Sequence, residues 1–415
     1  MTLIKYKFKN QIFLLISAIL FFTSCNKDVE QFTETPTVTP TGSALGETIA
    51  ATPTDSLYNR LIIKSGLSAS LNNKAKTFTM FVPDNDGMKL FINAISGIPL
   101  TDPDVVFSGF ITANLPSATA AAIVNYNTVP QKILFGNIPT TFPDFQLPTN
   151  IILDPTNPLV RMTTFPSRRT TYSYVNNIPV TAVDAIVANG VIHHTATIVA
   201  PPSTVLAGLI YPDPNLSYFS AAVARADSAQ VGLNRIDSLL KYPVLNMTVL
   251  APNDAAFQTL IYGLVFGKVF ALTGSAVIAD AQATATVALG PAFFSTPAFY
   301  GDLPAASVRG ILVYHILASQ SGGAYTPNIR AFSVNFPTTP IFIPTLVNTA
   351  FAAHPGIVAV ATFSGPFVSS LRFTGLGTFP PGGTPYSGPA ANAVTMDEHA
   401  VNGVVHIIDK ILLPQ

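Results

Sequence analysis

Candidate catalytic acids are scarce in the part of this 415-residue chain that is expected to fold. Of the four glutamates, only Glu398 lies beyond residue 54, and it directly follows Asp397. Two carboxylates can cleave a glycosidic bond when one is kept protonated and the other ionised. Neighbouring residues on a strand point to opposite faces, however, so we do not expect Asp397 and Glu398 to form such a pair.

Other groups with chemical potential are equally isolated. His193 and His194 could begin a metal site, but their side chains would diverge on a strand and no third ligand is evident. Residues 84–87 resemble the start of a calcium loop, yet Ile95 stands where an acid would complete it, so we expect a helix cap there. The motifs H-E-x-x-H, paired C-x-x-C and G-x-S-x-G do not occur. We therefore predict no catalytic residue, no bound metal and no cofactor.

Cys25, the only cysteine, follows an export-type segment. Lys5, Lys7 and Lys9 precede an apolar run at residues 12–22 that is too short to span a bilayer. The small residues before Cys25 resemble a bacterial lipobox. This resemblance implies that the chain is cleaved before Cys25, that Cys25 is lipidated and that the protein is anchored in the outer membrane. Exposure at the cell surface is one arrangement of such a lipoprotein. An ordinary secretory signal with an incidental cysteine is the alternative. One cysteine forms no disulfide within the chain, so a core must hold the fold together.

The elements that would position these residues come in two copies. Residues 189–202 and 402–414 both read Asn-Gly, then a β-branched apolar run containing a histidine, then proline. Asn-Gly favours a tight turn, the apolar run fits a strand, and proline ends it. Asp184 and Asp397 stand at the same distance before the two Asn-Gly pairs. This pattern predicts two copies of one domain.

Two more matching segments support the repeat. Residues 78–85 and 247–254 are each a short apolar strand followed by proline and a helix-capping Asp or Asn. Residues 115–126 resemble residues 303–314. In the second copy, four residues have the spacing of one helical face, namely Val308, Ile311, Leu312 and His315.

The separation between matching segments grows along the chain, which indicates insertions in the second copy. They fall at residues 263–299 and 375–389. We expect both to be long loops that form binding surface or mobile cover rather than core.

Three motifs of the second copy together resemble the fasciclin (FAS1) domain. They are T-V-L-A-P-N-D-A-A-F from Thr248, I-L-V-Y-H-I-L from Ile311, and N-G-V-V-H-I-I-D-K-I-L-L-P from Asn402. The first copy carries them weakly. The resemblance implies an α+β fold with two tandem FAS1-like domains, each a β-sandwich wedge with packed helices, and a role in extracellular adhesion or matrix binding.

The expected organisation has four parts. Residues 1–25 are a lipoprotein signal peptide ending at the lipobox cysteine, and residues 26–54 a Thr/Pro-rich extended tether. Residues 55–202 form the degenerate first domain, opening with a helix that stops near Gly66, and residues 215–415 the second domain with its insertions. A short linker is expected between the two domains, from Pro201 to about Asn215. The charged start of the tether is similar to that of Bacteroidetes-like surface lipoproteins, and a solvated spacer is the alternative.

Tyr314 and His315 match a dipeptide that the family resemblance connects with partner binding. Packing of Tyr314 and hydrogen bonding of His315 is the alternative that we favour, because His315 falls on the apolar helical face. Asn127 replaces the histidine in the first copy. Ser56, Ser228 and Ser238 each follow an aspartate in a short pattern of bacterial O-glycosylation, and helix caps or faces explain all three equally well.

The amino-acid composition argues against some classes of function. The chain is 48% hydrophobic and 10% charged with a net charge of zero, so it offers no basic field for nucleic acid. Lys268 and Asp280 interrupt the most apolar stretch after the signal region. We predict a lipid-anchored, non-enzymatic adhesion or binding protein whose partner is a protein, extracellular matrix or a glycan. The alternatives are an accessory component of an outer-membrane nutrient (glycan) uptake system and, less favoured, an enzyme.

Overall fold

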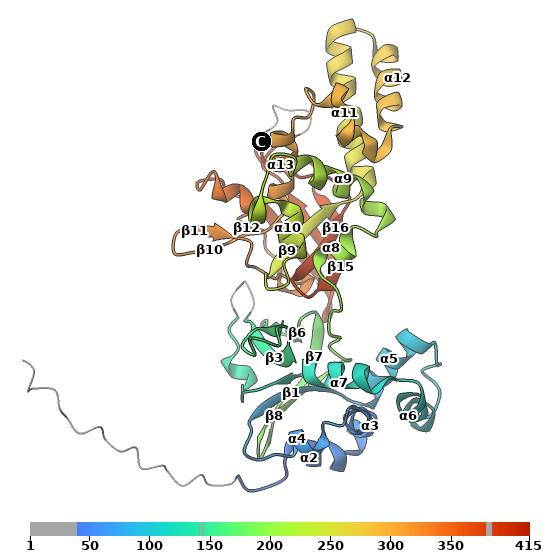
Figure 1. Ribbon diagram of the computed structural model, residues 1–415, viewed down its shortest axis with the longest axis vertical. Helices are drawn as coiled ribbons and strands as arrows, with labels where there is room; N and C mark the ends of the chain where they lie inside the picture. The colour runs from blue at the N-terminus through green and yellow to red at the C-terminus, as the bar shows by residue number, and fades with distance from the viewer. Residues whose placement is uncertain (1–39, 141, 143–144, 379–383) are drawn as a thin grey trace, which may run out of the picture. The chain divides into compact units, whose positions relative to one another are not determined.

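The computed structural model describes residues 40–140, 142, 145–378 and 384–415 (Figure 1). The predicted signal peptide, the lipidation site at Cys25 and most of the predicted tether therefore lie outside the described residues. Residues 42–415 form one compact unit. This unit contains two six-stranded sheets, one in each half of the chain.

The first half, residues 42–202, has the strand order β2-β1-β8-β7-β6-β5. Its strands are β1 (Phe78–Pro83), β2 (Thr128–Val129), β5 (Pro166–Arg168), β6 (Ser173–Val175), β7 (Ile178–Val187) and β8 (Gly190–Thr195), while β3 (Leu147–Ile152) and β4 (Arg161–Thr164) pair separately. Its helices are α2 (Leu45–Ala51), α3 (Ser56–Ser65), α4 (Ser68–Leu71), α5 (Asn85–Ser96), α6 (Asp104–Ala113), α7 (Ser117–Tyr126) and the short η1 (Pro53–Asp55) and η2 (Phe135–Asn137).

The second half has the strand order β12-β13-β14-β15-β16-β9. Its strands are β9 (Met247–Pro252), β12 (Ile341–Ile343), β13 (Ile357–Ser364), β14 (Phe367–Thr374), β15 (Ala391–Ala400) and β16 (Gly403–Ile408), with a separate hairpin of β10 (Ser319–Ser321) and β11 (Ala324–Thr326). Its helices are α8 (Leu206–Ile210), α9 (Ser217–Ala226), α10 (Ile236–Lys241), α11 (Asp254–Thr273), α12 (Ala276–Val287) and α13 (Ala305–Tyr314). Short helices are η3 (Pro214–Leu216), η4 (Gly232–Asn234), η5 (Gly290–Ser295), η6 (Pro297–Phe299), η7 (Ser333–Asn335) and η8 (Leu346–Thr349).

Both halves close their sheets in the same way. The last strand, β8 or β16, forms a hairpin with the strand before it and runs parallel to the first strand, β1 or β9. Gly190 is in register with Phe78, and Gly403 with Met247. The predicted closing strands and the predicted α+β class are therefore confirmed.

The cores lie where these strands meet the helices. Every residue of β1, β9 and β16 is buried, as expected for strands covered on both faces. In the first half, Met80 and Val82 pack with Leu61 of α3 and Ile123 of α7. In the second half, Val249 packs with apolar residues of α9, α11 and α13.

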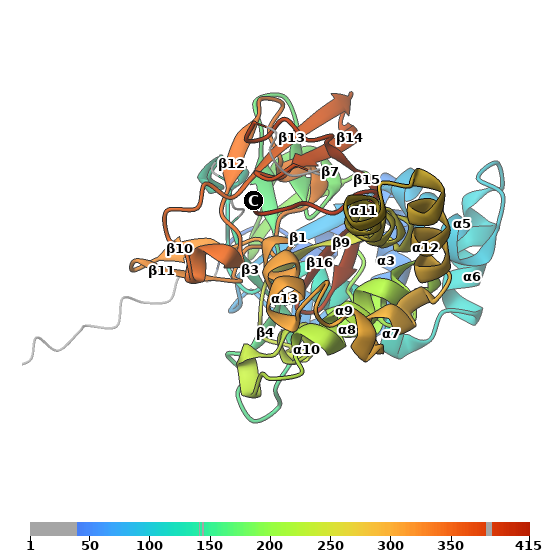
Figure 2. The same ribbon diagram turned by 90° about the horizontal axis from the view of Figure 1, so that it is seen from above.

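Three expectations are wrong in detail. Leu45–Ala51 is helix α2 rather than extended tether, because Leu45 and Ile49 share one helical face and are buried. Leu206–Ile210 is helix α8 rather than linker, for the same reason. The insertion at residues 263–299 is mainly helical, since it holds the end of α11 and all of α12, which pack side by side (Figures 1 and 2).

Arg330 contributes to the contacts between the halves. Its side chain is buried, and its guanidinium stacks on the ring of Phe165 at 4.7 Å. It donates hydrogen bonds to the carbonyl oxygens of Ala400 (3.2 Å) and Val401 (2.8 Å). The ring of Phe332 lies 6.1 Å from that of Phe165. Burial lowers the pKa of Arg330 to about 10, so the guanidinium stays charged at neutral pH.

Candidate functional site

The Tyr314-His315 pair lies at the end of α13, and both side chains are fully buried. The Tyr314 hydroxyl donates to the carbonyl of Gly356 (2.6 Å) and accepts from the N–H of Leu376 (3.0 Å). Burial raises the pKa of this hydroxyl, which therefore stays protonated. Tyr314 holds two loops against the end of α13 and offers no surface to a partner.

His315 is a neutral hydrogen-bonding group. Its Nε2 accepts from the N–H of Leu412 (2.9 Å), so Nδ1 carries the proton and donates to the carbonyl of Ile311 (2.8 Å). Burial lowers the pKa of His315 to about 4. Partner binding through these two residues remains a prediction, and the structure limits it to an indirect effect on the surface around them.

Asn127 takes the place of His315 in the first half. Its Nδ2 donates to the carbonyl of Ile123, one helical turn earlier, and to that of Val199, which follows the closing strand (both 2.9 Å). Its Oδ1 has no hydrogen-bond partner among the described residues. The amide thus joins the same two segments as the imidazole does, which indicates a structural role for this position in both halves.

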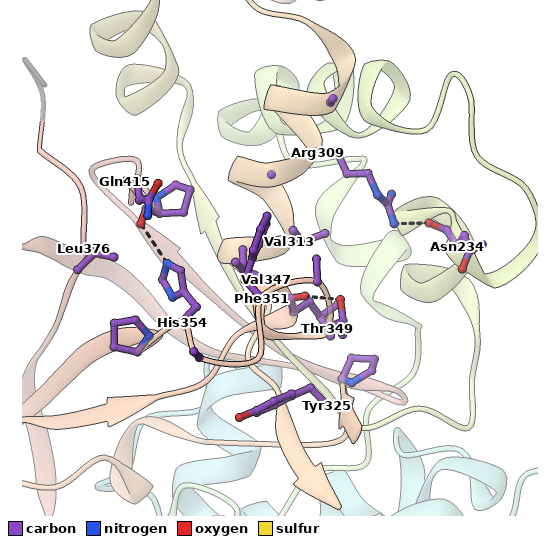
Figure 3. A pocket seen from close by; sticks show the side chains of 18 of the residues that line it. Asn234, Arg309, Val313, Tyr325, Val347, Thr349, Phe351, His354, Leu376 and Gln415 are labelled. Atoms are coloured by element: carbon purple, nitrogen blue, oxygen red, sulfur yellow. Dashed lines mark hydrogen bonds between the residues drawn. The ribbon is translucent and has the colours of Figure 1, made fainter. Parts of the chain in front are cut away.

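An apolar groove of about 840 Å³ lies on the other side of α13. One face of the helix lines it, with Ala306, Arg309, Gly310 and Val313 at helical spacing. The facing wall is η8 and the segment after it, while the floor and ends come from segments that are distant in the chain. Besides the four residues of α13, the lining residues are Leu233, Asn234, Leu239, Tyr325, Pro327, Leu346, Val347, Thr349, Ala350, Phe351, Ala353, His354, Pro355, Leu376, Pro414 and Gln415. Figure 3 shows Val313, Val347 and Phe351 close together in the middle of the groove.

Polar groups sit at the two ends of the groove (Figure 3). At one end Arg309 donates to the carbonyl of Asn234 (2.6 Å) and to the carboxylate of Asp227 (3.3 Å). At the other end His354 Nδ1 accepts from the N–H of Gly356 (2.9 Å), and Nε2 donates to the carbonyl of Pro414 (3.0 Å). An apolar middle with polar ends is typical of a binding groove.

Asp397 and His406 are engaged in the fold. Asp397 has a left-handed backbone (φ 65°), and its carboxylate accepts from the N–H (2.6 Å) and hydroxyl (2.5 Å) of Ser333. Its N–H donates to His406 Nδ1 (3.4 Å), and His406 Nε2 donates to the carbonyl of Ala331 (2.9 Å). Burial lowers the pKa of His406. Glu398 is exposed on the other face of β15, so the two acids do not converge.

The first half repeats this arrangement. Asp184 also has a positive φ (62°), and its carboxylate accepts from the N–H of Phe135 (2.8 Å). Its N–H donates to His193 Nδ1 (3.1 Å), and His193 Nε2 donates to the carbonyl of Ile133 (3.0 Å). The motif of one strained aspartate and one buried histidine is therefore a duplicated structural feature.

The remaining candidate residues lie apart from the groove. His194 pairs with Asp55 (3.2 Å), whose hydrogen bond raises the pKa of the histidine. Within the described ranges, no group of three potential ligands is placed to hold a metal. Asp84 caps α5 by accepting from the N–H of Gly87 (2.8 Å), so the helix-cap interpretation is confirmed.

The three serines that match a glycosylation pattern differ in exposure. Ser56 and Ser228 are exposed, and Ser238 is half-buried. Asp227, which precedes Ser228, accepts hydrogen bonds from the N–H groups of Ile236 and Asp237 at the start of α10. Modification of these serines remains a prediction.

The groove was missed by sequence reasoning. Its lining residues come from η4, α13, η8 and the segments near Leu376 and Pro414, which are far apart in the chain. The spacing of Ala306, Arg309, Gly310 and Val313 was the available indication, because these residues form the α13 face opposite to buried Val308 and Leu312.

Comparison with known proteins found a distant likeness among solved structures. No family model matches the chain, and no curated protein does. A solved structure of a FAS1 domain pair from the insect cell adhesion molecule fasciclin I is similar at 13% sequence identity and a TM-score of 0.31. The match covers 86% of this chain and 95% of that chain. A likeness at this level assigns neither a function nor a partner.

Proposed function

We propose that the chain is a lipid-anchored envelope protein with two FAS1-like domains that binds a partner and catalyses no reaction. Cys25 is the proposed lipidation site, and the outer membrane of a Bacteroidetes-like bacterium the proposed location, with the domains exposed at the cell surface. The domain boundaries move outward to include α2 and α8. The partner is a protein, an extracellular matrix component or a glycan.

The groove beside α13 carries the binding proposal. It has about 840 Å³, within the range of roughly 300–1,000 Å³ that is usual for binding pockets. Phe351 within it is 68% exposed, although burying such a side chain contributes about 1.5–3 kcal/mol. The apolar lining favours a protein partner among the three classes, because apolar side chains would fill the middle while the Arg309 guanidinium contacts a polar group at one end.

The duplicated contacts support the domain assignment. Three residues of the first half have hydrogen-bond partners at positions that correspond to those in the second half. They are Asp184, His193 and Asn189, and their counterparts are Asp397, His406 and Asn402. This correspondence supports a single module that occurs once in each half.

The binding test is a screen of the purified full chain against glycan arrays, matrix proteins and envelope proteins. For a partner found in this way, Phe351→Asp is expected to weaken binding at least about tenfold, since it places a charge in an apolar site. Phe367→Asp is the matched control, because Phe367 is 62% exposed on β14 and lies outside the groove. Equal effects of both variants, or turnover of a screened compound, would contradict the proposal. An uptake-system component as the sole partner would favour the accessory role.

The anchor is tested separately by growing cells with a labelled fatty acid. The label should be incorporated into the wild-type chain and absent from Cys25→Ala. An unlabelled wild-type chain would remove the lipid anchor and leave the groove proposal intact.

A further inference from the structure

The hairpin of α11 and α12 exposes large apolar side chains at its tip. The first part of α11 belongs to the core, where Phe257 and Ile261 are buried. Beyond it, Phe270 is 45% exposed and Leu272 76%, and on α12 Val277 is 80% exposed and Ile278 50%. These four residues flank the Gly274-Ser275 turn, and together they are here called the hairpin tip. Exposed clusters of this kind mark interaction surfaces.

The hairpin tip carries no charge. Residues 269–279 are all uncharged, and the nearest charged residues are Lys268 and Asp280. Lys268 pairs with Asp302, and Asp280 accepts a hydrogen bond from the hydroxyl of Tyr262 (2.6 Å). Both flanking charges therefore have partners that lie outside the tip.

Several polar groups of the turn are paired within the hairpin. The N–H of Gly274 donates to the carbonyl of Phe270 (2.8 Å), and the hydroxyl of Thr273 donates to that of Val269 (2.8 Å) and accepts from the N–H of Ser275 (3.2 Å). The Ser275 hydroxyl caps α12 by accepting from the N–H of Ile278 (3.4 Å). Each of these bonds lowers the cost of moving the turn out of water.

The geometry points to insertion of the hairpin tip into the interfacial region of a lipid bilayer. By length and composition α11 could cross a membrane, but its first part is core, so only the tip is available. With about 1.5 Å per residue, the last turn of α11 reaches about 5 Å, which matches the depth of interfacial helices. A second copy of the chain fits less well, since a stable protein interface buries about 800 Å² per partner, more than four side chains supply.

A tryptophan probe tests this inference directly. The chain contains no tryptophan, so in Leu272→Trp all indole fluorescence comes from the tip. We expect the emission of the full-length variant to shift to shorter wavelength on uncharged phosphatidylcholine vesicles, and to be quenched when the acyl chains are brominated. Leu159→Trp is the matched control, because Leu159 is 87% exposed in a loop of the first half and should stay in water.

A second substitution tests whether the apolar character of the tip is what causes its insertion. Adding Val277→Asp to Leu272→Trp places a charge on the tip and should lower vesicle insertion about tenfold, as charged residues are costly in lipid. Unchanged Leu272→Trp emission on vesicles would overturn the inference. A shift that occurs without vesicles and grows with protein concentration would also overturn it, by showing that a second copy covers the tip. Quenching that persists when Cys25→Ala is added to Leu272→Trp would support the inference and show that the tip acts independently of the proposed anchor.

Discussion

Asn402 accepts a 2.7 Å hydrogen bond from the N–H of Leu206, which opens the first helix of the same half. Its Nδ2 donates to the carbonyls of Leu240 and Tyr242 (both 3.0 Å). In the first half, Asn189 bonds to the N–H of Leu45 (2.7 Å) in the same way. The Asn-Gly pair is therefore more than a turn, because its buried asparagine joins the end of each half to its beginning.

Asn402→Ala should destabilise the protein by about 3 kcal/mol, because it removes the hydrogen-bond partner of two buried backbone groups, the N–H of Leu206 and the carbonyl of Leu240. Chemical denaturation followed by circular dichroism measures the change. Asn328→Ala is the control in the same half, since Asn328 is exposed, and it should fall within about 0.5 kcal/mol of wild type. Equal stability of the two variants would show that the asparagine bonds contribute little.

Gly403 is a second sensitive position in the closing turn. A Cβ at Gly403 would lie 2.5 Å from the carbonyl oxygen of Met247, so the two paired strands would have to separate. Gly403→Ala should therefore lower the melting temperature strongly. Gly267→Ala should raise it slightly, because Gly267 lies in α11 with open space around it and alanine favours a helix by about 1 kcal/mol. Changes of opposite sign in the melting temperature would show that Gly403→Ala acts through a steric clash and not simply through the replacement of a glycine.

His315 should make stability depend on pH. Its pKa is about 4 in the folded protein and 6.5 when unfolded, so above pH 6.5 it is neutral in both states and contributes no slope. Between pH 6.5 and about 4 only the unfolded state binds the proton. The free energy of unfolding therefore decreases as the pH falls through this range, by up to about 3 kcal/mol. His315→Asn should lose this part of the slope while keeping the bond to Ile311 that Asn127 makes to Ile123. An unchanged slope would assign the effect to the other buried histidines.

Arg330→Lys should also destabilise the protein. Lysine lacks the planar group that stacks on Phe165 and reaches two carbonyls, yet it keeps a buried charge, so we expect a loss of about 3 kcal/mol. The exposed Arg372→Lys is the control and should change the free energy of unfolding by less than about 0.5 kcal/mol. A loss as small as that of the control would mean that the stacking is dispensable.

Local patterns allowed much of the fold to be predicted. Helix α3 ends at Gly66, and β1 and β9 are each followed by a capping Asp84 or Asn253, as predicted. These features depend on residues that are close together in the chain, so they can be recognised from the sequence. Helices α2 and α8 were missed because each is short and is stabilised by an asparagine far away in the chain.

The site was less predictable for the same reason. Tyr314 and His315 were recognisable as a pair, but their burial depends on Gly356, Leu376 and Leu412, which the sequence does not place beside them. The insertion expected to be a loop is helical, because its alanines and other helix-compatible residues outweigh the glycine at its turn.

The position of β8 and β16 inside their sheets has a consequence for biosynthesis. Each strand arrives last, yet it lies between two strands made earlier, so neither sheet is complete until its final segment has been translated. A premature stop codon shortly before residue 403 would leave β9 and β15 with open edges and a nearly finished core exposed to proteases. Nonsense mutations late in the reading frame should therefore be as harmful as those in its middle.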